Sequence, residues 1–234
     1  MFSSTRSRII AAIAAAVVLG GGSYGIVTAT SGSASATATT SSSPAGGFGS
    51  GAGSNARSGP AAGGSSGTIS GVSSSGFTLT TSTGQKVTIK EASSTTYEDG
   101  TSPASASAVT TGEPVLVLGT TDNTTITATQ VIVSPPSGSA SNPGGQVISE
   151  TKGEPGSTQK VGQIPAGYKQ GAGTIVSGTT ADKATEAALA AYPGGIVDRV
   201  VTIGNGQYEV HYIGVNWPHH IFVSQNFQVI GADD

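Results

Sequence analysis

The sequence predicts two small folded domains, the first all-β and the second α+β, behind an N-terminal apolar segment. Large apolar residues gather in three blocks, and the stretches between them consist mainly of Gly, Ser, Ala, Thr and Pro. Such stretches bury too little apolar surface to offset the entropy lost on ordering them. We therefore expect five segments: an apolar N-terminus (1–29), a tether (30–66), a β-barrel (67–134), a linker (135–173) and an α+β domain (174–234).

Charge and cysteine content limit the classes of function. The net charge is -3, and Lys and Arg are too scattered to form a basic stripe for nucleic acid. The chain has no Cys, which excludes disulfides, thiolate metal sites and thiol chemistry. We expect no nucleic-acid partner.

The first 29 residues are typical of an export signal or a membrane anchor. Arg6 and Arg8 precede an apolar run that begins at Ile9 and continues to Val27. The run is close to the roughly 20 residues that span a bilayer, so cleavage and retention both stay open. In either case the basic residues stay in the cytoplasm and the rest of the chain is exported, to the extracellular space or the cell surface.

Two low-complexity stretches separate the blocks. Residues 30–66 form a flexible Ser/Gly/Ala/Thr-rich tether, and residues 135–173 form a stiffer linker that contains Pro135, Pro136 and Pro155. We expect both to be disordered, so that the two domains move independently.

Strand signals fill residues 67–134. Phe77 to Thr81 and Lys86 to Ile89 alternate apolar and polar residues around a turn at Ser82-Thr83-Gly84. Val115 to Leu118 is apolar on both faces, as in a central strand. These features predict a small antiparallel β-barrel or sandwich with Phe77 in its core. The barrel topology is related in shape to the oligonucleotide-binding (OB) fold. The block resembles a small β-barrel domain of unknown function that is common in exported bacterial proteins. The resemblance rests on the spacing from Gly71-Val72 through Gly112-Glu113-Pro114-Val115 to Ala128-Thr129-Gln130-Val131.

The C-terminal block begins with a helix signal. Thr179 or Thr180 can cap a helix whose first turn holds Asp182. An apolar stripe at helical spacing follows, and Pro193-Gly194-Gly195 ends the helix; the stripe consists of Ala184, Ala187, Ala188 and Ala191, with Leu189 beside it.

A hairpin at Asn205-Gly206 is expected next. If these are the two turn residues, Ile203 lies opposite Tyr208, Val201 opposite Val210 and Arg199 opposite Tyr212. One face of the pair is then largely apolar and the other mixed, as in a sheet that a helix covers on one side.

This order of elements resembles the PepSY family. The residues that carry the resemblance are Ala184 to Ala191, Pro193-Gly194-Gly195, Val197, Val200, Tyr208-Glu209-Val210, Phe222-Val223 and Val229-Ile230. The resemblance implies one helix packed on an antiparallel sheet, in a non-catalytic domain that inhibits or regulates secreted peptidases. The family's acidic residue and Gly between the last strands are replaced here by Ser224-Gln225-Asn226.

Four residues are candidates for contact with a protein partner: Tyr208, Glu209, His211 and Trp217. Trp217 is either an exposed anchor or part of the core. We expect no catalytic residues and no cofactor. We also expect no metal site, because neighbouring strand residues such as His219 and His220 point to opposite faces.

These observations lead to three hypotheses. The favoured one is an exported, non-enzymatic protein that binds and modulates a secreted or envelope peptidase. The alternative is a structural or sensing module of the cell envelope without a peptidase partner. A weak histidine-based metal binder is the least favoured of the three, since it would need a metal site that we do not expect.

Overall fold

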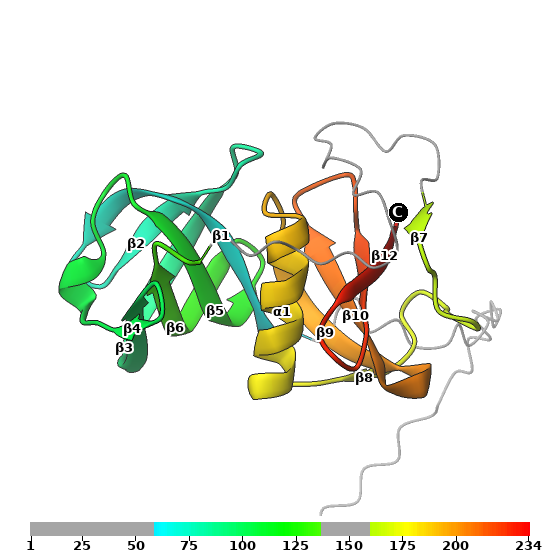
Figure 1. Cartoon of the computed structure of the whole chain (residues 1–234). Helices are drawn as coiled ribbons and strands as arrows, with labels where there is room; N and C mark the ends of the chain where they lie inside the picture. Colours follow the sequence, from blue (N-terminus) through cyan, green and yellow to red (C-terminus); the bar gives the residue numbers. More distant parts are fainter. Residues whose placement is uncertain (1–58, 137–159) are drawn as a thin grey trace, which may run out of the picture. The chain divides into compact units, whose positions relative to one another are not determined.

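A computed structural model describes residues 59–136 and 160–234. The apolar N-terminus, most of the tether and most of the linker lie outside the described residues. Among the described residues, no helix is both long enough and apolar enough to cross a bilayer. These described residues fold mostly as β-structure, with a five-stranded barrel and one α-helix (Figure 1).

Five strands close the barrel in the order β2-β3-β6-β5-β1, and β1 pairs back to β2. They are β1 (Ala61–Ser73), β2 (Gly76–Thr80), β3 (Lys86–Asp99), β5 (Pro114–Asp122) and β6 (Thr125–Val133), with a short β4 (Ser102–Pro103) and a 3-10 turn η2 (Ala106–Ala108) between β3 and β5. The expected hairpin, central strand and buried Phe77 are confirmed.

The barrel is not fully antiparallel, because β3 and β6 run parallel. Strands around a closed barrel can alternate in direction only if their number is even. A ring of five strands must therefore contain at least one parallel pair, and the prediction of a purely antiparallel barrel was wrong on this point.

The remaining elements are β7 (Lys160–Gly162), β8 (Thr174–Ile175), α1 (Thr179–Ala191), β9 (Ile196–Ile203), the 3-10 turn η3 (Gly204–Gly206), β10 (Gln207–Ile213), β11 (His220–Val223) and β12 (Val229–Asp233). The antiparallel sheet has the order β9-β10-β11-β12-β7, and β8 pairs with β9. Helix α1 covers one face of this sheet (Figure 1). Ala184, Ala188 and Leu189 are buried in the core between them, as the helical stripe predicts.

The helix begins differently from the prediction. Its N-cap is Gly178, with φ 65° and no side-chain cap hydrogen bond, rather than Thr179 or Thr180. Asp182 does lie in the first turn. Gly adopts a positive φ without a steric penalty. The backbone therefore turns into the helix at Gly178, where no side chain caps the first turn.

The register of the β9–β10 hairpin differs by one residue from the prediction. Gly204, Asn205 and Gly206 form a three-residue turn, so Ile203 pairs with Gln207 and Val200 with Val210. A slip of one residue reverses the faces of one strand relative to its partner. Tyr208, Val210 and Tyr212 therefore face the helix together with Val200, whereas Arg199 lies opposite His211 on the other face.

Strand β1 joins the barrel to the second sheet. Gly64 and Ser65 pair with Val197 and Ile196 of β9 as well as with β5. All described residues belong to one compact unit of the chain. Residues 61–66, expected as tether, and residues 160–162, expected as linker, are strands in the structure.

Candidate functional site

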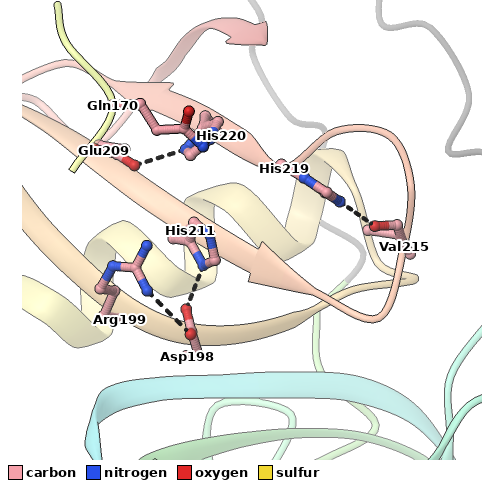
Figure 2. A network of polar contacts seen from close by, with 8 residues as sticks. All are labelled: Gln170, Asp198, Arg199, Glu209, His211, Val215, His219 and His220. Atoms are coloured by element: carbon pink, nitrogen blue, oxygen red, sulfur yellow. Dashed lines mark hydrogen bonds and ion pairs between the residues drawn. The ribbon is translucent and has the colours of Figure 1, made fainter. Parts of the chain in front are cut away.

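The sheet face opposite α1 carries a network of polar side chains (Figure 2). Alternation along β10 and β11 directs Glu209, His211, His220 and Phe222 to this face, because their neighbours Val210, Ile221 and Val223 pack into the core beneath the helix. The segment 163–173, between β7 and β8, contributes Tyr168 and Gln170 to the same network.

Glu209, His220 and Gln170 form a chain of hydrogen bonds. His220 Nδ1 lies 2.7 Å from Glu209 Oε1, and its Nε2 lies 3.1 Å from Gln170 Nε2. The Gln170 amide nitrogen can only donate, so His220 Nε2 accepts and Nδ1–H donates to the carboxylate. Glu209 is 2% exposed and His220 is 1% exposed, whereas Gln170 lies at the surface. The imidazole is thereby held in one tautomer with both nitrogens occupied.

Tyr168 completes this part of the network. Its ring meets Phe222 edge to face at 4.6 Å and lies 5.9 Å from the His220 ring. Burial, and next the nearby Glu209 carboxylate, raise the pKa of the Tyr168 hydroxyl far above its usual range, while Arg199 acts in the opposite direction. Tyr168 therefore stays neutral and packs against the rings of Phe222 and His220.

A second group centres on Asp198. The pairing of β9 with β10 passes from Arg199 to Val197, so Asp198 is the extra residue of a β-bulge. Its carboxylate accepts a 2.6 Å hydrogen bond from His211 Nδ1 and lies 3.2 Å from Arg199 Nη1 (Figure 2). Arg199 is only 4% exposed, and its ion pair with Asp198 compensates its burial.

The three histidines lie close together but do not point at one centre. Their ring centroids are 5.2 to 6.5 Å apart, and His219 Nε2 donates to the Val215 carbonyl at 2.7 Å. Each ring thus has at least one nitrogen bonded to a neighbouring group. In residues 59–136 and 160–234, no three His, Cys, Asp or Glu side chains are arranged to hold a metal ion.

The four contact candidates have different surroundings. Glu209 and Trp217 are each 2% exposed, so neither presents its side chain to a partner in this structure. The core alternative for Trp217 thus holds, since it packs with the residues beneath α1. His211 is partly buried against Asp198. Tyr208 is partly exposed.

Tyr208 belongs to a surface cluster that we call the aromatic patch: Tyr208, Phe227 and Lys183. The Tyr208 and Phe227 rings are stacked at 5.6 Å with an interplanar angle of 6°, and Lys183 Nζ lies 5.5 Å from the centre of the Phe227 ring. A cation over an aromatic face is attracted by the ring quadrupole. The patch therefore brings two stacked aromatic rings next to a positive charge that α1 supplies.

Several residues of the network could not be found from the sequence. Tyr168 and Gln170 lie in a segment whose Pro and Gly content is typical of a linker. Asp198 joins the network through a bulge, which has no sequence signature here. Only the alternation of Glu209 and His211 along one strand could have indicated a shared polar face.

Comparison of the chain with protein-family models, curated proteins and solved structures finds no match.

Proposed function

We propose that this protein is an exported, non-enzymatic regulator whose C-terminal domain binds a secreted or envelope peptidase and inhibits it. The observation that carries the proposal is the aromatic patch, because partly exposed aromatic rings that pack on one another are common anchors of protein interfaces. The class of partner comes from the resemblance to PepSY domains, and the helix on an antiparallel sheet is consistent with it.

The surroundings of His220 support a non-enzymatic role. A catalytic histidine needs a nitrogen within reach of the substrate. His220 is buried, and its two nitrogens are occupied by Glu209 and Gln170. We infer that the network stabilises the sheet and the segment 163–173 rather than acting on a substrate. The proposed location at the cell surface, with the N-terminal segment cleaved or kept as an anchor, rests on the sequence alone.

One observation favours the alternative, a structural or sensing module of the envelope. Pairing of Gly64 and Ser65 in β1 with Val197 and Ile196 in β9 joins the barrel and the second sheet. Such a pairing suits a rigid spacer that holds two surfaces in a fixed relation. A spacer of this kind needs no inhibitory surface, so the two hypotheses differ in what the aromatic patch does.

The test is a titration of the purified chain into secreted peptidase activity of the same cells. The titration uses the whole chain, because β7 and the segment 163–173 pack on the C-terminal sheet and β1 of the barrel pairs with β9. We expect saturable inhibition that Tyr208→Ala and Phe227→Ala weaken, while Val72→Ala, on the exposed surface of the barrel, leaves it unchanged. Absence of inhibition at micromolar concentrations would support the structural alternative.

A further inference from the structure

A groove of about 690 Å³ runs beside the aromatic patch. Helix α1 forms one wall, and the ends of β3, β5 and β6 form the other. Its floor is apolar, with Leu116, Ile132 and Leu189, and Phe227 and Lys183 of the patch stand at its rim. A volume of this size is within the range of about 300 to 1,000 Å³ that is typical of ligand sites.

Two carboxylates line this groove from opposite walls. Glu98 comes from β3 and Glu186 from α1. Glu98 accepts a hydrogen bond from Gln130 Nε2 at 3.1 Å. Among the described residues of the lining, Lys183 is the one basic side chain. The groove therefore carries an excess of negative charge above an apolar floor.

The electrostatics of Glu186 are consistent with this excess. Burial is the main cause that raises the pKa of its carboxyl group, followed by the charges of Asp182 and Glu98, while Lys183 lowers it. The two carboxylates of the groove thus repel each other. A cation placed between them would relieve the repulsion.

We propose that this groove binds an extended peptide segment in which a basic side chain neighbours an apolar one. The apolar side chain would lie on Leu116 and Ile132, and the Lys or Arg side chain would reach Glu98 and Glu186. The proposal rests on the proposed function in that the segment belongs to a protein partner. It adds the chemistry of the epitope and extends the binding surface from the aromatic patch to the barrel.

The choice of occupant follows from charge complementarity. An acidic segment would add a third negative charge to the groove, and a purely apolar one would bury the two carboxylates without adding a positive charge beside them. In a segment with one basic and one apolar side chain, the basic group pairs with the carboxylates of the walls and the apolar group packs on the floor. Such a segment also favours rapid encounter, which salt would slow.

The test uses the purified full chain and a fluorescent probe, an acetylated pentapeptide of alternating Leu and Lys. The control probe has Glu in place of Lys. We expect saturable anisotropy changes with the basic probe only. Glu98→Gln and Glu186→Gln should each weaken binding about fivefold, the size of one partly exposed ion pair. Glu113→Gln, which changes the net charge equally outside the groove, should leave binding unchanged.

Three outcomes would overturn the proposal: equal binding of both probes, unchanged affinity in both groove variants, or self-association of the chain through the groove. Glutamine is close to glutamate in size, and the amide oxygen introduced by Glu98→Gln could still accept the bond from Gln130, so misfolding is not an expected explanation. The peptidase titration is read separately. Probe binding without peptidase inhibition would contradict the peptidase partner and leave the groove as a peptide-binding site. Inhibition without probe binding would contradict the peptide-binding role of the groove.

Discussion

The Thr83 hydroxyl, between β2 and β3 of the barrel, donates a 2.8 Å hydrogen bond to the carbonyl of Gly194, which follows helix α1. The two neighbouring carbonyls are bound in the same way, since Ser66 Oγ donates to Pro193 at 3.1 Å and Ser65 Oγ to Gly195 at 3.2 Å. Three hydroxyls of the barrel thus hold three successive carbonyls of one turn. The Pro-Gly-Gly sequence that ends the helix is also the point where the two sheets meet.

This contact predicts that the barrel and the C-terminal domain unfold together. Ser65 is buried, and Ser65→Ala should lower the free energy of unfolding by about 1 kcal/mol, the value of one hydrogen bond. Urea unfolding followed by tryptophan fluorescence, which reports Trp217, and by circular dichroism should give coincident curves. Ser82→Ala, on an exposed turn residue, is the control. Two separate transitions would show that the domains fold independently.

A side chain at Gly195 should be poorly tolerated. A Cβ there would overlap the ring of Tyr212, which is 1% exposed and whose hydroxyl donates to the Tyr192 carbonyl at 2.8 Å. The ring cannot move away without losing this bond, so we expect Gly195→Ala to cost about 3 kcal/mol or more. Gly204→Ala is the matched control, because a Cβ at Gly204 meets no atom within 4 Å. The free energy of unfolding in urea provides the comparison, and equal losses in both variants would contradict the packing argument.

The hydrogen-bond chain predicts one tautomer of His220. Nitrogen-15 NMR of the imidazole should show a proton on Nδ1 and none on Nε2, with Nδ1–H protected from exchange by burial. Glu209→Gln retains an oxygen that can accept this bond and should cost about 1 to 3 kcal/mol of stability, whereas Glu209→Ala leaves buried polar groups unpaired and should cost more. An Nε2–H tautomer in the wild-type protein would refute the assignment.

Glu186 should make stability fall as the pH rises. Burial raises the pKa of its carboxyl group in the folded state above the value in the unfolded chain. The folded state therefore binds the proton more tightly, and this contribution is complete at low pH and lost as pH rises through the folded-state pKa. At pH 7 we expect Glu186→Gln to be more stable than the wild type, and the difference should shrink as the solution is acidified to pH 4. Thermal melts over this range measure it.

The same substitution at Glu113 controls for the change in net charge. A wild type that is more stable than Glu186→Gln at pH 7 would contradict the argument, since it would mean that the ionised carboxylate is stabilised by its surroundings. If Glu186→Gln raises stability and also weakens peptide binding, Glu186 contributes to binding at a cost in stability.

The sequence determined most of the local structure. Alternation at Phe77 to Thr81 and Lys86 to Ile89 specified a hairpin, and the alanine stripe of residues 184–191 specified a helix packed closely on a sheet. These signals are local, because side-chain direction follows from the period of each element. Glu209 and His211 lie on the same face of β10 by the same rule. Assigning this segment to a strand was therefore enough to place both side chains on one face.

Only the tertiary structure decided the joining of the two sheets and the make-up of the polar network. The Gly and Ser residues at 61–66 are typical of a tether, yet a Cβ at Gly63 would overlap the Val197 carbonyl and one at Gly64 the Val117 carbonyl. Small residues are needed there because β1 lies between β5 and β9. Composition alone does not distinguish a chain that stays flexible from one whose small side chains admit a close neighbour. That distinction depends on residues as far as 130 positions away, such as Gly195, whose carbonyl accepts a hydrogen bond from Ser65. No local pattern contains such a contact.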